Sequence, residues 1–360
     1  MNARVPKPVL VTGASGFIGR HLVQRLIERG CRVSCLVRAT SRIGELRSAG
    51  VQLITGDVTD RAGMGSALEE SQAGDVTDRA GIGRALEVSQ AGVVFHLAGL
   101  VKALRADDFV RVNTGGVESV AGACARRADP PVLVVVSSLS AAGPSAVDRP
   151  RVEGDSPTPV SAYGRSKLAG EQAAAKYAAG VPISIVRPPI VFGPGDRGTL
   201  QMFRPIARSG FHVVPGRGEC RFSLIHVADL VEGLLLVAEK GERLHPSGTP
   251  GQGVYFMAAE DSPTYAELGA AMAAALGKKR ATVVRVPWPL VRLVGLCGDA
   301  MGRIRRRPGW VNSDKIAEAL AGSWTCSSVK ARTHLGWSPA SVLADRLRET
   351  AQWYRQAGWL

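Results

Sequence analysis

The sequence predicts an α/β fold, in which a doubly wound parallel sheet is followed by a smaller, mostly helical lobe toward the C-terminus. Short apolar stretches that are typical of buried strands, such as "PVLV", "CRVSCLV" and "VQLIT", recur in the first part of the chain. The first of them leads through a glycine turn into an amphipathic helix, which is the order found in dinucleotide-binding sheets. At 360 residues the chain exceeds the usual size of a single core, so we expect two lobes.

The first strand, Val9 to Val11, is followed by glycines at positions 13, 16 and 19 and by a helix that ends at Gly30. Glycines at this spacing allow a tight turn, a close approach of the backbone to a pyrophosphate, and close packing of helix on strand. The helix N-terminus would face the phosphates. The turn therefore predicts a Rossmann-like nucleotide site with contacts from Gly13, Ser15, Gly16, Phe17, Ile18 and Gly19.

The second strand ends where an acidic residue usually accepts the adenosine ribose hydroxyls of NAD. This chain has no carboxylate there, and it has two guanidinium groups instead, on Arg38 and Arg42. Guanidinium groups suit a 2′-phosphate. The sequence therefore favours NADP(H) over NAD(H) as the cofactor.

Five motifs carry a more specific resemblance: "TGASGFIG" (12–19), "FHLAG" (95–99), "VVVSSLSAAG" (134–143), "YGRSK" (163–167) and "RPPIVFGPGD" (187–196). In this order the chain resembles the extended short-chain dehydrogenase/reductase family, which includes NAD-dependent epimerase/dehydratases and 3β-hydroxysteroid dehydrogenase-like enzymes. The resemblance implies a nucleotide-binding domain over 1–190, with a helix at 226–240 packing back on it, and a substrate-binding lobe over 191–360. It also implies hydride transfer between a nicotinamide and a secondary alcohol or ketone, on a sterol-like or other small molecule.

Tyr163 and Lys167 are the candidate acid/base pair. They are four residues apart in an alanine-rich helical stretch, so both side chains lie on one face. A phenol titrates near pH 10, and a neighbouring ammonium would lower its pKa toward neutral pH. The spacing to Tyr163 and Gly143 identifies Ser138 as the family's catalytic serine, which would polarise the substrate oxygen. The resemblance also implies that Lys167 binds the nicotinamide ribose.

A tandem duplication complicates the third strand. Residues 56–73 are repeated almost unchanged as residues 74–91. The family's third strand ends in an Asp that contacts adenine, and only Asp57 directly follows a strand, with Val58 beside it. Asp75 and Asp78 are then spare, and glycines in the repeat favour two short helices with a break near Gly74 over one long helix.

The resemblance assigns several further contacts. Leu97, Ala98 and Gly99 follow the fourth strand beside the cofactor, and Pro188 lies in the stretch that holds the nicotinamide carboxamide. His96 is expected to be a packed residue near the cofactor. Asn113 either steadies the active-site region or only caps a helix. Ser140 and Arg221 are candidate substrate contacts, the latter to a diphosphate in an epimerase-like reaction.

Composition narrows the class of protein and its surroundings. The hydrophobic content of 45% and the charged content of 21% are those of an ordinary globular protein. The N-terminus has no secretory signal pattern and no long window is free of charge, so we expect a cytoplasmic protein without a spanning helix. The six cysteines are scattered, without metal-site spacing, and no metal is expected.

The net charge of +14 is concentrated in one segment. Residues 276–310 hold nine Lys and Arg residues against Asp299 alone. Within it, the apolar stretch 286–307 is flanked by arginines, which is typical either of a peripheral contact with an anionic membrane or of a core helix with a basic outer face. Nucleic acid is not an expected partner, because no nucleic-acid-binding motif accompanies the charge.

Three functions remain open. The first is an NAD(P)-dependent dehydrogenase or reductase that exchanges its cofactor at each turnover. The second is a nucleotide-sugar epimerase that retains NAD. The third is a non-catalytic cofactor-binding subunit, against which the intact Ser138, Tyr163 and Lys167 argue. A homodimer is expected because it is common in the family.

Overall fold

A seven-stranded parallel sheet forms the centre of the protein. The computed structural model describes residues 7–59, 81–146, 148–309 and 312–360. The sheet order is β10-β6-β5-β4-β1-β2-β3, and every pair in it is parallel. The strands are β1 (Val9–Thr12), β2 (Val33–Val37), β3 (Gln52–Thr55), β4 (Val93–His96), β5 (Val132–Val136), β6 (Ile183–Arg187) and β10 (Val254–Phe256). The predicted doubly wound sheet is thus confirmed.

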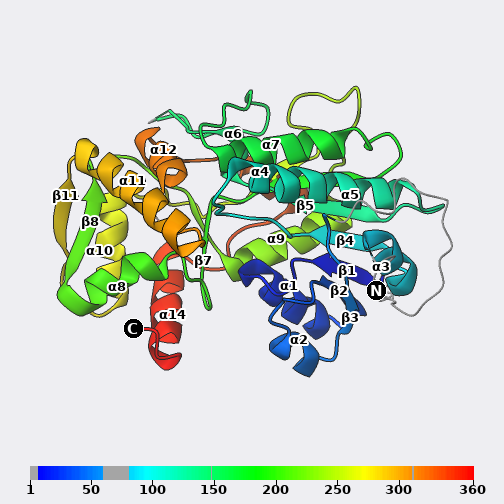
Figure 1. The fold of residues 1–360 in the computed structure, drawn as a ribbon, viewed down its shortest axis with the longest axis horizontal. Coiled ribbons are helices and arrows are strands. Elements are labelled where there is room, and N and C mark those ends of the chain that lie inside the picture. The colour runs from blue at the N-terminus through cyan, green and yellow to red at the C-terminus, as the bar shows by residue number, and fades with distance from the viewer. Residues whose placement is uncertain (1–6, 60–80, 147, 310–311) are drawn as a thin grey trace.

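Helices cover both faces of this sheet because its strands are apolar on both sides (Figure 1). One face packs against α1 (Phe17–Glu28), α2 (Gly44–Ser48), α9 (Val227–Lys240) and α13 (Val329–Leu335). The other packs against α3 (Ile82–Ser89), α5 (Gly115–Ala125) and α7 (Ala162–Ala175). Two short helices, α4 (Ala106–Phe109) and α6 (Leu139–Ala142), and a π-helical turn, η1 (Val110–Thr114), lie near the carboxyl ends of the strands.

A second lobe stands beside the sheet. Its core is formed by α8 (Leu200–Ser209), α10 (Tyr265–Ala275) and α14 (Leu343–Gln356). Two small parallel sheets, β7 (Ile190–Phe192) with β9 (Leu224–His226) and β8 (Phe211–Pro215) with β11 (Thr282–Val286), accompany it. The helices α11 (Trp288–Arg305) and α12 (Ser313–Leu320) complete it (Figure 1).

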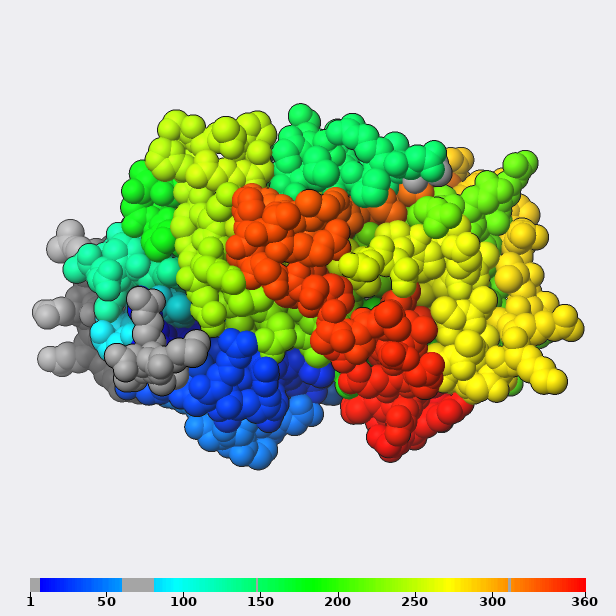
Figure 2. Space-filling view, turned by 180° about the vertical axis from the view of Figure 1, so that it is seen from behind, coloured from blue at the N-terminus to red at the C-terminus, as the bar shows by residue number. Residues whose placement is uncertain are grey.

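The two lobes exchange segments. The sequence analysis assigned 191–360 to the substrate lobe, apart from the helix at 226–240. In the structure, β10 from that range extends the central sheet, and α13 packs against α9 and β10. Figure 2 shows the segment around α13, in orange, across the middle of one face of the molecule, next to α14 in red. The C-terminal third therefore holds the two lobes together.

The second copy of the repeat contributes α3, whose apolar side chains pack under the sheet. Residues 60–80 lie outside the described residues, and with them Asp75, Asp78 and the expected break near Gly74. In the part of the chain that the structure describes, no helix has both the length and the hydropathy to cross a membrane.

Candidate active site

The turn between β1 and α1 forms a bare backbone surface that fits a pyrophosphate. Gly13 has φ +75°, and a Cβ there would lie 2.6 Å from the Ala98 nitrogen. At Gly19 a Cβ would lie 2.2 Å from the Gly13 carbonyl oxygen. No side chain caps α1 at Gly16, so the first N–H groups of the helix remain available to an anion. Ser15 lies in the same turn, and Phe17 and Ile18 are the first two residues of α1.

The carboxyl ends of the next two strands lie beside this turn. Arg38 and Arg42 follow β2, and both are exposed. Asp57 follows β3, and its carboxylate accepts hydrogen bonds from the Thr59 backbone nitrogen and hydroxyl, both at 2.9 Å. Val58 is buried, and a Cβ at Gly116 would lie 3.1 Å from it. This edge offers two cations and one carboxylate to the adenosine half of a dinucleotide.

The end of β4 is tied to β1. The Leu97 nitrogen donates to the Thr12 carbonyl oxygen at 3.1 Å, and the Ala98 nitrogen donates to the Thr12 hydroxyl at 3.4 Å. His96 Nδ1 also lies 2.8 Å from that hydroxyl. Burial, with a smaller effect of the Lys167 charge, lowers the pKa of His96 to about 3, so the imidazole is neutral at pH 7. His96 therefore packs in the strand end as expected.

Asn113 connects three elements instead of capping a helix. It lies within η1, and its Oδ1 accepts from the Leu100 nitrogen at 2.7 Å. Its Nδ2 donates to the Leu100 carbonyl oxygen at 3.0 Å and to the Ser166 hydroxyl at 2.9 Å. A Cβ at Gly99 would lie 3.0 Å from Asn113 Oδ1. The asparagine thus holds the loop after β4 against α7.

The structure brings Ser138 and Tyr163 together. Ser138 caps α6, where its hydroxyl accepts from the Ser140 nitrogen at 3.1 Å, and the same hydroxyl lies close to the Tyr163 phenol. Burial raises the pKa of Tyr163, and the Lys315 ammonium and the Ser138 hydroxyl act in the opposite direction. Two hydroxyl groups therefore meet at one point, as a substrate oxygen would require.

Lys167 lies behind this pair. Its ammonium donates to the Val136 carbonyl oxygen at 2.7 Å, at the carboxyl end of β5. A Cβ at Gly99 would lie 3.6 Å from its Nζ. Burial lowers the pKa of Lys167 to about 8, although Glu171 opposes that shift. The lysine therefore faces the end of β5 and Gly99, which follows β4.

A buried ion pair that the sequence analysis did not identify supports this arrangement. Arg187 donates to Glu171 from Nε at 2.9 Å and from NH2 at 2.5 Å. Both side chains are only 5% exposed. Ser137, next to Ser138, also donates to Glu171. The helix that carries Tyr163 is thus tied to the ends of β5 and β6.

A cavity of about 370 Å³ opens above the two hydroxyl groups. Ser138, Ser140 and Tyr163 line it, while Arg221 is not among the lining residues. The Arg221 guanidinium instead donates to the Ser262 carbonyl oxygen at 3.0 Å. Pro188 lies between β6 and β7, where its carbonyl oxygen accepts from the Leu139 nitrogen at 2.9 Å. The apolar walls of the cavity include Val101, Leu139, Pro189, Ile190, Pro215, Phe222, Trp288, Ala319 and Trp324.

Lys315 and Glu318 from α12 also line the cavity, and the sequence analysis did not identify either of them. The Lys315 ammonium donates to Glu318 at 2.8 Å and lies 4.8 Å from the centroid of the Tyr163 ring. The sequence analysis predicted only a mostly helical lobe for this part of the chain. Nothing in its local pattern indicates that it reaches residue 163.

A phosphate-binding turn at one end of β1 and a hydroxyl pair under a cavity suit hydride transfer at a carbon–oxygen bond. Residues 9–249 match the model of the NAD dependent epimerase/dehydratase family. The chain belongs to this family. The protein is therefore an NAD(P)-dependent oxidoreductase of the extended short-chain dehydrogenase type.

Relatives of this family member include reductases. The chain is 33% identical to a ceramide reductase of Caulobacter vibrioides, over 98% of this chain and 96% of that one. It is 30% identical to a 4-hydroxy-2-methyl-3-oxo-4-farnesyl-3,4-dihydroquinoline-1-oxide ketoreductase of Stigmatella aurantiaca, over 91% of both chains. Its fold resembles a UDP-glucose 4-epimerase of Thermotoga maritima, with a TM-score of 0.73, 21% identity, and 97% and 99% of the two chains covered.

Proposed function

We propose that this protein is an NADPH-dependent ketoreductase that acts on a long-chain lipid, namely the ketone that corresponds to the secondary alcohol of a ceramide. The observation that carries the proposal is the apolar cavity above the Ser138 and Tyr163 hydroxyl groups. The full-length similarity to a ceramide reductase supports this class of substrate.

Each polar residue of the site has a role in this reaction. NADPH supplies the hydride to the carbonyl carbon when it is bound. Ser138 donates a hydrogen bond to the carbonyl oxygen, and Tyr163 donates the proton that the oxygen needs as it becomes a hydroxyl. Lys167 binds the nicotinamide ribose, and the backbone at Pro188 lies against the carboxamide. Ser140 lies at the substrate side of the cavity, where it contacts the polar groups of the substrate next to the ketone.

The size and lining of the cavity support an amphiphilic substrate. A volume of about 370 Å³ is near the lower end of the range of ligand sites, so it accommodates only part of a long-chain lipid. The remaining alkyl chains must then lie outside. Trp288 lines the cavity and is also the first residue of α11, so the cavity wall continues into that helix.

The same lining argues against the epimerase alternative. A nucleotide sugar carries a diphosphate, which proteins usually bind through several cations. Lys315 is the one cation among the described residues that line the cavity, and it is paired with Glu318. Arg221, the candidate diphosphate ligand, points to the Ser262 carbonyl oxygen instead.

The choice of NADPH rests on Arg38 and Arg42. Their exposed guanidinium groups follow β2, and the stretch 37–42 contains no carboxylate that would repel a 2′-phosphate. Asp57, Val58, Leu97, Ala98 and Gly99 complete the adenine and ribose contacts in this proposal.

The α11 helix supplies a membrane contact in this proposal. Most of its exposed apolar side chains recur every three or four residues and share one face, which we call the α11 face: Leu290, Leu293, Val294, Cys297, Met301 and Ile304. Leu296 is also exposed but lies off this face. Of the whole helix only Val291, Gly295 and Gly302 are buried, so the interpretation as a core helix does not fit. Arg292, Arg303, Arg305, Arg306 and Arg307 flank the face, and this charge is complementary to an anionic bilayer.

Cofactor exchange and turnover test the main proposal. The purified protein should contain no bound nucleotide, and it should oxidise NADPH when a 3-oxo ceramide is added in mixed micelles. Retention of NAD through purification, together with no NADPH oxidation, would contradict a reductase and support the epimerase. The absorbance at 340 nm and the nucleotide released by acid measure both quantities.

Sedimentation with vesicles tests the membrane contact. Wild type should pellet with phosphatidylglycerol vesicles at low salt, and Leu293→Asp/Ile304→Asp should not, while Val329→Asp, at an exposed apolar site on α13, should behave as wild type. Absence of wild-type binding at low salt would overturn the contact. A wild-type dimer that only the double variant dissociates would instead assign the α11 face to the homodimer that the family resemblance leads us to expect.

A further inference from the structure

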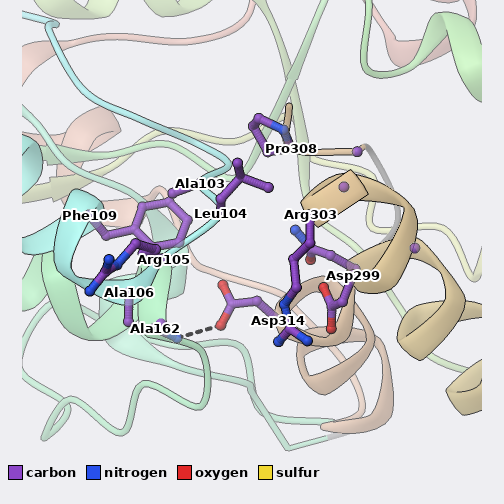
Figure 3. Close-up of a pocket in the computed structure, with 14 residues that line it drawn as sticks. Ala103, Leu104, Arg105, Ala106, Phe109, Ala162, Asp299, Arg303, Pro308 and Asp314 are labelled. Atoms are coloured by element: carbon purple, nitrogen blue, oxygen red, sulfur yellow. Dashed lines mark hydrogen bonds between the residues drawn. The ribbon is translucent and has the colours of Figure 1, made fainter. Parts of the chain in front are cut away.

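The first turn of α7, which carries Tyr163, is held by α12 from the other lobe. The Asp314 carboxylate accepts from the Ala162 nitrogen at 2.6 Å and from the Tyr163 nitrogen at 3.2 Å. Figure 3 shows Asp314 hydrogen-bonded to Ala162 at the edge of a small hollow that residues of α11 also line. A carboxylate at this position satisfies N–H groups that a helix leaves free, and it stabilises the positive end of the helix dipole.

A second contact joins the same two helices. The Ser161 hydroxyl caps α7 by accepting from the Gly164 nitrogen at 2.9 Å, and it donates to Glu318 at 2.8 Å. Glu318 in turn accepts from the Lys315 ammonium. Asn312 caps α12 through the Lys315 nitrogen at 2.9 Å, so the helix that presents Lys315 is itself fixed at its start.

Lys315 is the cation that lies against the Tyr163 ring. Its Nζ is 4.8 Å from the ring centroid, and the Phe109 ring lies 5.9 Å from the same ring. An ammonium at this distance is attracted by the ring and favours the phenolate.

The other charged groups near the ring have partners of their own. On α7, Lys167 is bound to the Val136 carbonyl oxygen. On the α4 side, Asp107 and Asp108 pair with Arg105 and Arg111, at 3.5 and 2.8 Å. On α12, Asp314 binds backbone N–H groups, and Glu318 is shared between Ser161 and Lys315. Towards α6, Ser138 presents only its hydroxyl.

We propose that Lys315 is a second cation of the active site, supplied by the C-terminal lobe, which stabilises the Tyr163 phenolate, and that Asp314 and Glu318 fix it there. This inference rests on the proposed function, in which Tyr163 donates the proton. When Tyr163 gives its proton to the substrate oxygen, the phenolate forms beside the Lys315 ammonium. Lys315 acts through Tyr163 and is therefore a positioning residue.

The protonation states agree with this arrangement. Burial alone would lower the pKa of Lys315, but Glu318, Tyr163 and Asp314 outweigh it and raise the pKa above its ordinary value. Lys167, by contrast, has a pKa lowered to about 8 by burial. Lys167 therefore loses its charge at a lower pH than Lys315 does. The phenolate is needed for alcohol oxidation, and Lys315 is the charge that persists where phenolate forms.

A titration of Tyr163 itself tests the inference without any substrate. The phenolate absorbance near 295 nm is recorded against pH for each protein, and the curve of the same protein carrying Tyr163→Phe is subtracted. In Lys315→Met the midpoint should rise by about one pH unit, while Lys315→Arg should keep the wild-type midpoint. The matched control is Lys279→Met, an exposed lysine that does not line the cavity, and it should also keep the wild-type midpoint.

The pH dependence of kcat/KM gives a second readout. We would follow NADP+-dependent oxidation of N-hexanoyl-sphinganine. The rising limb should move to higher pH in Lys315→Met by the same amount, with about a tenfold loss at pH 7 and recovery in Lys315→Arg.

Failure of this inference is distinguishable from failure of the proposed function. An unchanged titration midpoint in folded Lys315→Met would overturn the role of Lys315, even if Tyr163→Phe abolishes turnover. A shifted midpoint in a protein that never turns over the lipid would support the role of Lys315 and contradict the substrate.

Discussion

Removal of one partner of the buried Glu171–Arg187 pair should destabilise the protein strongly. In Glu171→Gln the Arg187 guanidinium, which is 4% exposed as a residue, loses the carboxylate that takes two of its hydrogen bonds. An uncompensated buried charge of this kind costs about 3–5 kcal/mol. Ser137 also loses its acceptor, although the amide oxygen of Gln can replace it. We therefore expect the free energy of unfolding to fall by about 3–5 kcal/mol.

Removal of both partners should cost less. In Glu171→Met/Arg187→Met no charge remains buried, and apolar side chains of similar length fill the space. The double variant should therefore be more stable than Glu171→Gln, which means that the two changes are strongly non-additive. Glu87→Gln, an exposed carboxylate on α3, is the matched control and should change stability by less than about 0.5 kcal/mol.

The assay is equilibrium unfolding in urea, followed by circular dichroism. The slope against denaturant should stay constant, so that the shift in midpoint reports stability. A loss below about 1 kcal/mol in Glu171→Gln, or a double variant less stable than the single one, would refute the reasoning. The same variant bears on the site, because Glu171 opposes the fall in the pKa of Lys167. In Glu171→Gln the pKa of Lys167 should fall further.

Two further predictions concern the cofactor site, and a third concerns stability at low pH. Arg38→Glu should weaken NADPH binding far more than NADH binding, and an equal loss of both affinities in fluorescence titrations would contradict the 2′-phosphate contact. Gly19→Ala places a Cβ 2.2 Å from the Gly13 carbonyl oxygen, so it should weaken NADPH binding at least about tenfold. The control Gly44→Ala, whose Cβ would have no atom within 4 Å, should leave NADPH binding unchanged. Equal NADPH affinities in the two variants would show that the turn tolerates the methyl group. Burial lowers the pKa of His96 from 6.5 to about 3. Between pH 6.5 and about pH 3 the unfolded state therefore binds a proton at His96 that the folded state does not bind, so stability falls as the pH drops through this range. His96→Gln should reduce this slope, by up to about 1.4 kcal/mol per pH unit, and a slope as steep as in wild type would assign the acid sensitivity to other groups.

The nucleotide-binding half was predictable because its signals are local. The spacing of Gly13, Gly16 and Gly19 already indicates that the turn requires glycine. The structure shows why at two of them, since a Cβ at Gly13 or Gly19 would lie within 3 Å of backbone atoms. Tyr163 and Lys167 lie on one helix four residues apart, so their common face also follows from spacing. Strands such as β1 and β2 are buried on both faces and are therefore continuous apolar stretches.

The remainder depends on contacts between distant segments. Lys315 reaches Tyr163 only because α12 docks on the start of α7. Glu171 on α7 meets Arg187 only because the helix packs over the carboxyl end of β6. No local pattern predicts either contact. The expectation that the Lys167 ammonium lowers the pKa of the Tyr163 phenol toward neutral pH was wrong. In the structure that ammonium is bound to the Val136 carbonyl oxygen, and burial raises the pKa of Tyr163.

The second lobe was predicted only in outline. The pairing of β8 with β11 joins two short segments that are separated by more than sixty residues. The helix α8 contains Pro205, which is a poor signal for a helix. The apolar side chains of α11 could have belonged to a core, and only the structure shows that they are exposed.

Tyr163→Phe tests the central claim most directly. The variant keeps the ring against Phe109 and Lys315 and removes only the hydroxyl that meets Ser138. NADPH affinity, measured by fluorescence titration, should stay within about twofold of wild type, while the rate of NADPH oxidation with the 3-oxo ceramide should fall by about 10²–10⁴-fold. Turnover at the wild-type rate, with NADPH bound normally, would contradict the role of Tyr163 as the proton donor.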